Sequence, residues 1–190
     1  SENPWEAICL DHGGLVFYGG LIGGTLSLVA TCLLRRLPMG RVADMLIPGL
    51  PLGHALGRIG CFLNGCCFGQ PWSGPCGVHY DAGSQAAVTQ CQQGLIAAPS
   101  LAPLPVFPIQ LLAVIANFAI FFGLLAIERR LRGRGQLLGL YIAVYGLYRF
   151  AIEFLRGDYL DAGMLTPAQE VSVVLVPVGV VVFLLRRGKG

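Results

Sequence analysis

The hydrophobic residues of this chain gather into five long apolar stretches that polar segments separate. The hydrocarbon core of a bilayer is about 30 Å thick, and an α-helix of roughly 20 apolar residues crosses it. Each stretch is close to that length, so the pattern predicts an all-α, polytopic transmembrane helical bundle that forms one domain over residues 1–190. The five expected spans are residues 15–34, 45–62, 106–127, 137–155 and 168–185.

Prolines and a cap motif refine the boundaries of these helices. Pro48 and Pro51 lie inside the second stretch, and because proline lacks a backbone N–H, they predict a break in that helix. Residues 166–169, with the sequence Thr-Pro-Ala-Gln, precede the fifth stretch. A capping Thr, a Pro at the first helical position and a Gln three residues after the cap predict a helix N-terminus at this point.

Composition agrees with a membrane location. Of 190 residues, 55% are hydrophobic and 12% are charged, and this charged share is about half that of a soluble domain. Such a chain has too little polar surface to cover a soluble globule. The net charge of +3 gives no basis for a nucleic-acid partner, and none is predicted. The chain begins at Ser1 without a signal peptide, so we expect a processed or truncated start that lacks earlier helices.

Most basic residues follow the first, third and fifth stretches, which places them on one side of the membrane. By the positive-inside rule, that side is the cytoplasm. The N-terminus, the long loop 64–105 and the loop 157–167 are then expected outside, and the C-terminus is expected in the cytoplasm. The residues that set this orientation are Arg35, Arg36, Arg41, Arg129, Arg130, Arg132, Arg134, Arg186, Arg187 and Lys189.

Three other arginines, Arg58, Arg149 and Arg156, lie within a span or at its outer end. Ionisable groups at membrane depth are costly and usually face a cavity or a partner. The planar guanidinium group can hold a phosphate through two parallel hydrogen bonds. These arginines therefore predict an anion site that is reached from the outer leaflet. The alternative is that they only reach the outer headgroups or pair with Glu153.

A polar stripe follows one face of the fourth predicted helix. Tyr145, Arg149, Glu153 and Arg156 recur at i, i+4, i+8 and i+11. This spacing puts them on one side of the helix, with Glu153 one turn from Arg149. A polar stripe on an apolar span is expected to face inward, where it serves either a functional site or an ion pair that fixes helix packing.

Glycine pairs and thiols mark two further segments. Residues 12–24 begin with His12 and contain three Gly-Gly pairs, which let a ligand approach the backbone closely or let helices pack through small residues. Residues 57–69 bring Arg58, Asn64 and three cysteines to the outer end of the proline-broken span. Non-helical backbone at that depth is tolerated where it lines a cavity.

The seven cysteines cannot all pair within the chain, because their number is odd. On the expected outer side, where a bacterial envelope is oxidising, they could form two structural disulfides, serve thiol–disulfide exchange or bind a metal; we favour the structural role. No C-x-x-C pair is present, and the spacing is not that of a two-armed zinc site, so no cofactor and no metal is predicted. The cysteines on this side are Cys61, Cys66, Cys67, Cys76 and Cys91.

The three polar segments, in this order and spacing, resemble sequence blocks of the prolipoprotein diacylglyceryl transferases. The family's blocks are Gly-Gly-Met-Ser-Phe-His-Gly-Gly-Leu, Gly-Arg-x-Gly-Asn-Phe-x-Asn-x-Glu-x-x-Gly and Tyr-Gly-x-x-Arg-Phe-x-x-Glu-x-x-Arg. Family members usually have seven spans, so two N-terminal ones are expected to be absent here. The matching positions are Arg58, Gly60, Asn64, Gly69, Gln110, Tyr145, Arg149, Glu153 and Arg156.

The resemblance implies transfer of a diacylglyceryl group from phosphatidylglycerol to the thiol of a lipobox cysteine in a prolipoprotein signal peptide, with release of glycerol phosphate. It implies a multi-pass protein of the bacterial inner membrane whose active site faces the periplasm. Arg58 and Arg149 would stabilise the departing phosphate, and Glu153 would orient Arg149. Tyr145 and Gln110 would hydrogen-bond the head group. The other expected substrate-binding positions are His12, Gly19, Gly20, Asn64 and Arg156.

The chain departs from the family pattern at four places, one of which is the family's His-Pro-Ser-Gln segment, which reads Phe107-Pro108-Ile109-Gln110 here. Tyr18 replaces the family's His before Gly-Gly, Cys61 replaces its Asn, and Cys66 replaces its Glu. Tyr18 is the expected catalytic residue at the His position, but the base that takes the thiol proton stays open between Tyr18, His12 and His54. The departures also support an alternative function as a non-catalytic phospholipid-binding or thiol-redox membrane paralogue.

Overall fold

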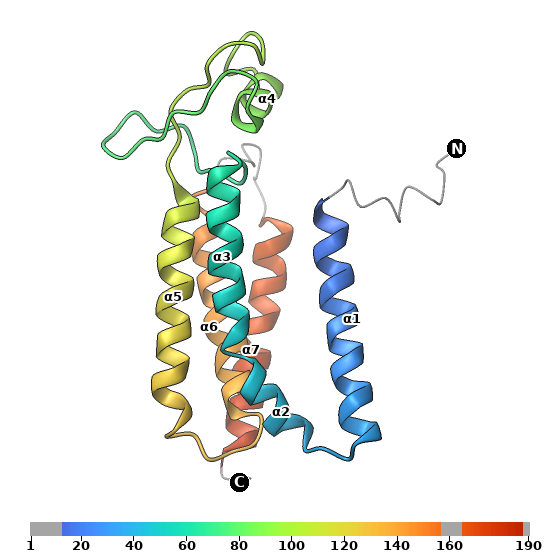
Figure 1. The fold of residues 1–190 in the computed structure, drawn as a ribbon. Coiled ribbons are helices and arrows are strands. Elements are labelled where there is room, and N and C mark those ends of the chain that lie inside the picture. Colours follow the sequence, from blue (N-terminus) through green and yellow to red (C-terminus); the bar gives the residue numbers. More distant parts are fainter. Residues whose placement is uncertain (1–12, 157–164, 188–190) are drawn as a thin grey trace.

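The computed structural model describes residues 13–156 and 165–187. Within these ranges the chain is helical and contains no β-strand, only isolated bridges between loop residues. This confirms the expected all-α class. The helices, shown in Figure 1, are α1 (Gly13–Leu34), α2 (Met39–Leu46), α3 (Gly49–Leu63), α4 (Gln85–Gln92), α5 (Ile109–Glu128), α6 (Gln136–Glu153) and α7 (Pro167–Arg186).

Helices α3, α5, α6 and α7 stand side by side and form a bundle (Figure 1). The most extensive packing is between α6 and α7, followed by that between α3 and α5. Glycines let α6 and α7 approach closely, because a Cβ atom on Gly139 would overlap the backbone of Phe183, and one on Gly179 would overlap that of Ala143. Such contact through small residues is typical of membrane helices.

Helix α1 stands apart from the bundle and connects to it mainly through α2 (Figure 1). Apolar side chains of α1 are exposed, including Ile22 at 58% and Leu26 at 64%. A Cβ atom added to Gly19 or Gly20 would meet no atom within 4 Å. These glycines therefore make no close approach to another described element.

All five apolar stretches that were expected to span a membrane form helices, namely α1, the α2–α3 pair, α5, α6 and α7. Length and hydropathy qualify three segments of the described chain as membrane-spanning: Met39–Leu63, Ile109–Glu128 and Pro167–Arg186. Residues Ile22–Leu34 form a shorter apolar helix. The fold is thus that of a helical bundle with apolar helices suited to a membrane.

Two expected boundaries are confirmed, whereas α2 begins at Met39, before the expected second span, and Pro51 lies inside α3 rather than at a break. The second stretch is broken after α2, and Pro48 immediately precedes α3. At the start of α7, the Thr166 hydroxyl oxygen accepts a hydrogen bond from the Gln169 N–H (3.3 Å), and Gln169 Oε1 accepts one from the Thr166 N–H (3.0 Å). These two bonds are the capping box that the sequence predicts.

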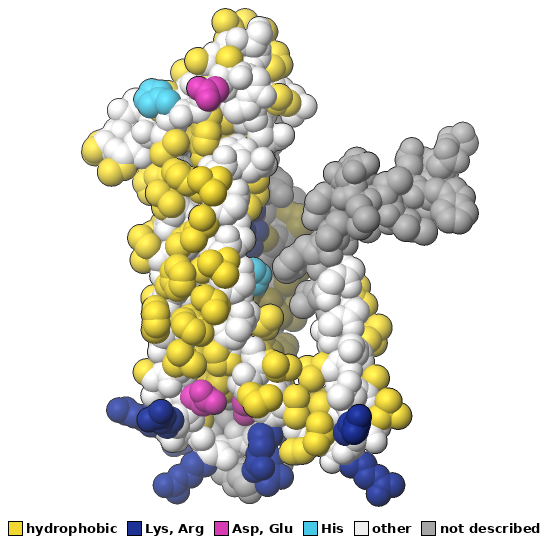
Figure 2. Space-filling model, in the orientation of Figure 1, with side chains coloured by type: hydrophobic (Ala, Val, Ile, Leu, Met, Phe, Trp, Pro, Cys, Tyr) yellow, Lys and Arg dark blue, Asp and Glu magenta, His cyan; other side chains and the backbone are white. Residues whose placement is uncertain are grey.

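The two ends of the bundle differ in charge, as Figure 2 shows. Lys and Arg side chains gather at the end formed by the α1–α2 turn, the α5–α6 turn and the end of α7, which we call the basic end. The opposite end, formed by residues 64–108, is the loop end. On the face that Figure 2 shows, many apolar side chains lie between the two ends. The arginines of the basic end are Arg35, Arg36, Arg41, Arg129, Arg130, Arg132, Arg134, Arg186 and Arg187.

Asp44 joins α2 to α6 at the basic end. Its Oδ2 accepts a hydrogen bond from the Gly135 N–H (2.6 Å), and its Oδ1 accepts one from the Leu138 N–H (2.9 Å). The carboxylate thus satisfies backbone groups that lack intrahelical partners at the N-terminus of α6, where negative charge is also favoured.

The loop end is folded, although its sequence shows little apolar periodicity. Ser84 caps α4 by accepting a hydrogen bond from the Ala87 N–H (3.3 Å). The fully buried Gln90 accepts a hydrogen bond from the Leu104 N–H (2.7 Å) and donates one to the Leu104 carbonyl (3.0 Å). The buried apolar core of the loop end consists of Phe68, Ala86 and Val106.

Candidate active site

Arginines from separate parts of the chain converge on one cleft near the loop end of the bundle. Arg58 comes from α3 and Arg149 from α6, and Arg156 follows the end of α6 by three residues. Helix α5 supplies a further wall, and the cleft has a free volume of about 10 Å³. Its lining residues are Arg58, Cys67, Ile109, Gln110, Ala113, Tyr148, Arg149, Ile152 and Arg156.

Glu153 holds two of these arginines in place. Its side chain is 1% exposed and forms an ion pair with Arg149 and a longer one with Arg156 (Nη1 to Oε2, 4.0 Å). Its other oxygen, Oε1, accepts a hydrogen bond from the Thr166 hydroxyl (3.2 Å). A buried carboxylate is costly unless it is paired and hydrogen-bonded, and these contacts meet that need. The cap residue of α7 thereby reaches the arginine site.

The cleft is electropositive. Its three guanidinium groups against the one carboxylate of Glu153 leave a formal net charge of +2. The side chains of Arg149 and Arg156 are 19% and 15% exposed, so water screens their charges less than it would at an open surface. This arrangement can bind an anionic group such as a phosphate, to which a guanidinium group donates two parallel hydrogen bonds.

Gln110 connects the cleft to the loop end. Its Nε2 donates hydrogen bonds to the Cys66 carbonyl (2.9 Å) and to the Tyr80 hydroxyl oxygen (3.3 Å). Burial raises the pKa of Tyr80, which keeps its hydroxyl protonated, while the hydrogen bond from Gln110 acts in the opposite direction. The Oε1 atom of Gln110 is buried and has no hydrogen-bond partner among the described residues. A buried acceptor of this kind is available to a hydroxyl group of a ligand.

Tyr148 and Asn117, which the sequence motifs did not single out, complete one side of the site. Tyr148 lines the cleft, and its hydroxyl oxygen accepts a hydrogen bond from Asn117 Nδ2 (3.1 Å). The same Nδ2 donates to the Ala113 carbonyl (2.8 Å). Asn117 follows Gln110 by seven residues, or about two helical turns. Two polar residues at this spacing on an otherwise apolar helix lie on one face, so the sequence held a signal that this face is part of a polar site.

Two expected site residues, Tyr145 and Asn64, do not line the cleft. Tyr145 precedes Arg149 by one helical turn, and its ring stacks on that of His54 at a centroid distance of 5.3 Å. His54 in turn precedes Arg58 by one turn of α3. Asn64 caps the C-terminus of α3 and is exposed. Binding roles for Tyr145 and Asn64 therefore stay predictions.

The glycine-rich segment is not brought to the cleft by the described structure. Gly19 and Gly20 lie in α1, which stands apart from the bundle. The side chain of Tyr18 and the whole of His12 lie outside the described residues. Their expected roles also stay predictions.

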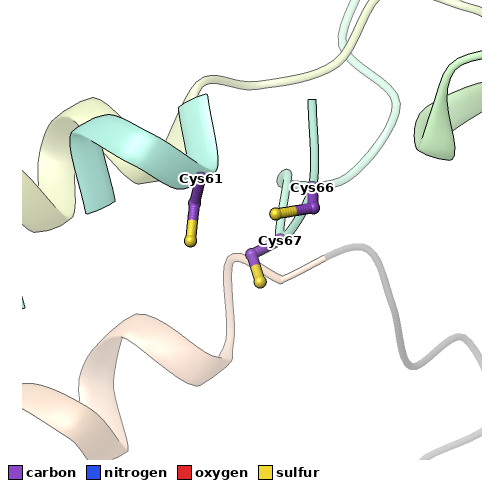
Figure 3. Close-up of side chains that lie close together, drawn as sticks. All are labelled: Cys61, Cys66 and Cys67. Carbon is purple, nitrogen blue, oxygen red and sulfur yellow. The ribbon is translucent and has the colours of Figure 1, made fainter. Parts of the chain in front are cut away.

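Three cysteines lie close together at the end of α3, as Figure 3 shows. Cys61 lies near the end of α3, Cys66 and Cys67 lie in the loop that follows, and their Sγ atoms are all within 4.8 Å of one another. Cys67 also lines the cleft. All three are free thiols in the structure.

Gly69 brings this loop back against the end of α6. Its N–H donates a hydrogen bond to the Phe107 carbonyl (2.9 Å), and the next N–H, that of Gln70, donates to the Leu155 carbonyl (3.3 Å). A Cβ atom on Gly69 would lie 2.7 Å from the Phe107 oxygen. Only glycine fits this approach without a shift of the backbone.

Comparison with known proteins places the chain among its relatives. The family model for prolipoprotein diacylglyceryl transferase matches residues 1–185. A phosphatidylglycerol–prolipoprotein diacylglyceryl transferase of Clostridium tetani is 34% identical over 188 residues, which cover 98% of this chain and 69% of that relative. A protein of the same name from Rhodospirillum rubrum is 33% identical over an alignment of 198 positions. The alignment covers 97% of this chain and 64% of that relative. The chain thus spans about two thirds of the length of these relatives, and it belongs to the prolipoprotein diacylglyceryl transferase family of enzymes.

Proposed function

We propose that this protein transfers a diacylglyceryl group from phosphatidylglycerol to the thiol of a lipobox cysteine in a prolipoprotein and releases glycerol phosphate. The observation that carries the proposal is the cleft in which Arg58, Arg149 and Arg156 surround one space beside Gln110. The names of the relatives supply the two substrates. The cleft supplies the charged and polar groups that this reaction needs.

The reaction exchanges one bond at a glycerol carbon. A bond forms between that carbon and the acceptor sulfur, and the bond from the same carbon to a phosphate oxygen breaks. The electron pair stays on the departing glycerol phosphate, which changes from a singly charged diester to a monoester with a charge of about −1.5 to −2. Groups that bind this developing charge more strongly than the ground state lower the barrier. We assign this task to Arg58 and Arg149.

Arg149 is preoriented for this task by its neighbours. Glu153 pairs with it from within the bundle, and the Thr166 hydroxyl hydrogen-bonds the other carboxylate oxygen of Glu153. A donor that is already aligned needs no rearrangement when charge develops. Arg156, at 4.0 Å from the same carboxylate, adds positive charge and contributes to phosphate binding.

The head group of the donor carries hydroxyl groups as well as a phosphate. We assign Gln110 Oε1, a buried acceptor without a described partner, to one of these hydroxyls. The Tyr145 hydroxyl is the second candidate, because Tyr145 lies one turn from Arg149 on α6. Hydrogen bonds from a site built for hydroxyl groups discriminate strongly against ligands that lack them.

Three residues are candidates for the base that accepts the acceptor thiol proton, and one of them, His12, lies outside the described residues. Tyr18 occupies the position of the family's His. His54 lies one turn before Arg58 and stacks on Tyr145, so it is the described candidate nearest to the arginine site. Since imidazole has an unperturbed pKa of about 6.5 and a phenol about 10, histidine is the chemically better base near neutral pH.

The proposal includes an orientation in the membrane. We infer five spans formed by α1, the α2–α3 pair, α5, α6 and α7, with the basic end in the cytoplasm of a bacterial inner membrane. The arginines of the basic end support this orientation through the positive-inside rule. The cleft near the loop end then opens toward the outer leaflet and the periplasm, where a prolipoprotein signal peptide reaches it.

A transfer assay in liposomes tests the function. It combines the purified protein, phosphatidylglycerol and a lipobox peptide, and it follows the peptide mass and the release of glycerol phosphate. We expect a mass gain of one diacylglyceryl group. Liposomes without phosphatidylglycerol and a peptide with Ser in place of the lipobox Cys serve as controls.

Absence of product with folded protein would contradict the transferase proposal. Phosphatidylglycerol binding without product would then favour a phospholipid-binding paralogue. Cys61 and Cys66 replace two polar family positions, and their Sγ atoms lie within 4.8 Å of that of Cys67. This cluster gives a thiol-redox paralogue specific support, and thiol-dependent electron transfer would identify it.

A further inference from the structure

The three thiols beside the cleft differ from ordinary buried cysteines. Cys61, Cys66 and Cys67 are half-buried, and their Sγ atoms lie within 4.8 Å of one another (Figure 3). Two other cysteines of the loop end, Cys76 and Cys91, do not belong to this cluster. The cluster therefore needs an explanation of its own.

The backbone fixes the cluster independently of any bond between the sulfurs. The Cys66 N–H donates a hydrogen bond to the Cys61 carbonyl (3.1 Å), and the Cys66 carbonyl accepts one from Gln110 Nε2 (2.9 Å). Cys67 adopts a left-handed conformation with a φ of +57°, which is uncommon for a residue other than glycine. The tight turn after α3 thus keeps the three Sγ atoms within 4.8 Å of one another (Figure 3).

The sulfur positions are close to those of a three-thiolate metal site. A zinc–sulfur bond of about 2.3 Å places two ligands of a tetrahedral site roughly 3.8 Å apart. The observed upper limit of 4.8 Å exceeds this by about 1 Å, which small side-chain rotations can close. Thiolates favour soft cations with a filled d shell, of which zinc is the common example.

We propose that Cys61, Cys66 and Cys67 bind one zinc ion as thiolates and leave its fourth position open at the edge of the cleft. Each thiol releases its proton to solvent on binding. Three thiolates and one divalent cation carry a net charge of −1, which the excess positive charge of the neighbouring cleft complements. Cys67 places this ion beside Arg58, because both residues line the same cleft.

The open position gives the site a role in the proposed reaction. The acceptor thiol must lose its proton before it attacks carbon, and a thiol that coordinates zinc is deprotonated outright. The acceptor cysteine would occupy the fourth position, give its proton to the base proposed above and attack as a thiolate next to the phosphate site. The thioether that forms is a weaker ligand and leaves the metal. This role rests on the proposed transferase function, whereas metal binding itself does not.

Cobalt titration of the reduced full chain in detergent tests the site, because Co²⁺ substitutes for zinc and reports its ligands by absorption. We expect one equivalent to bind with thiolate charge-transfer bands and to be displaced by zinc. The separate variants Cys61→Ser, Cys66→Ser and Cys67→Ser should each weaken binding at least about 10-fold, as loss of one ligand requires. The matched variants Cys76→Ser and Cys91→Ser should bind like the parent protein.

Two binding results would overturn the metal site, and one chemical result would do the same. One is absence of cobalt binding by reduced, folded parent protein, and the other is unchanged binding when all three clustered cysteines are replaced. A disulfide between two of these cysteines in protein isolated without reductant, detected by mass spectrometry, would also count against the site.

The acceptor role is tested separately by adding the lipobox peptide to the cobalt-loaded protein. We expect the absorption bands to change with the cysteine peptide and not with its serine counterpart. An unchanged spectrum would refute the acceptor role while leaving metal binding intact. If the spectrum changes but the zinc-loaded protein yields no transfer product, the proposed transferase function fails and the metal site stands.

Discussion

Thr166 and Glu153 show how a helix cap can serve a distant site. The Thr166 hydroxyl accepts a hydrogen bond from the Gln169 N–H and donates one to Glu153. The hydroxyl oxygen that caps the N-terminus of α7 therefore also hydrogen-bonds Glu153, the carboxylate that pairs with Arg149. Any loss of this hydroxyl should affect both the stability of α7 and the alignment of the arginine site.

We predict that Thr166→Val lowers both the stability of the protein and the rate of diacylglyceryl transfer. Valine keeps the shape but cannot cap the helix, which should cost about 1 kcal/mol of unfolding free energy. Misalignment of Arg149 should reduce kcat about 10-fold to 100-fold with a smaller change in KM. Thermal unfolding in detergent and steady-state transfer kinetics measure the two effects. Thr166→Ser keeps the hydroxyl and should resemble the parent protein, and an unchanged kcat in Thr166→Val would refute the positioning role.

At this scale the sequence predicted the residue types of the site but only part of its contacts. Arg58, Arg149 and Arg156 were expected to form an anion site because charged groups at membrane depth need partners, and they do line one cleft. The bond from Thr166 to Glu153 and the approach of Cys61 to Cys67 were not predicted, because both depend on turns whose geometry the sequence does not reveal.

Helices α6 and α7 meet through glycines rather than through interlocking large side chains. Their backbones are so close at Gly139 and Gly179 that added Cβ atoms would overlap the partner helix. Since α6 carries Arg149 and Glu153, and α7 begins at Thr166, this contact sets the geometry of the site. The pair is therefore a structural support for the chemistry.

We predict that Gly179→Ala destabilises the protein by about 1–3 kcal/mol through overpacking. The matched variant Gly123→Ala lies in open space on α5, where alanine improves helix propensity by up to about 1 kcal/mol. It should leave the unfolding midpoint unchanged or raise it slightly. Thermal unfolding in the same detergent compares the two. Equal effects in both variants would contradict the close contact between α6 and α7.

The long elements of the fold were predictable from sequence, and the short ones were not. Apolar length predicts α1, α5, α6 and α7, and prolines predict the break between α2 and α3. Helix α4 escaped prediction because a short helix stabilised by tertiary contacts leaves little periodicity. Gln90 of α4 exchanges two hydrogen bonds with the Leu104 backbone. These residues are 14 positions apart, and nothing in the sequence pattern pairs them.

The whole molecule is polarised along the bundle axis. Arginines cover the basic end, apolar side chains cover the middle (Figure 2), and the folded loop lies at the other end. The arginine cleft lies near the loop end. If this axis crosses the membrane as proposed, the substrates and the positively charged loops are on opposite sides.

We predict this orientation to be visible by thiol labelling in intact cells. A single-cysteine variant that keeps only the exposed Cys76 should react with a membrane-impermeant maleimide added outside. A single-cysteine variant with Arg130→Cys at the basic end should react only after the cells are permeabilised. The opposite pattern would reverse the orientation, and labelling of both from outside would contradict a membrane-spanning bundle.

The central claim is that the arginine cleft binds the departing phosphate, and one paired measurement tests it most directly. Arg58→Ala and Arg35→Ala each remove one positive charge, the first from the cleft and the second from the basic end. In the liposome transfer assay, Arg58→Ala should lower kcat/KM at least about 100-fold, as loss of one charge-stabilising group does in other enzymes, whereas Arg35→Ala should retain nearly full activity. A folded Arg58→Ala protein that transfers diacylglyceryl groups as fast as Arg35→Ala would contradict the assignment.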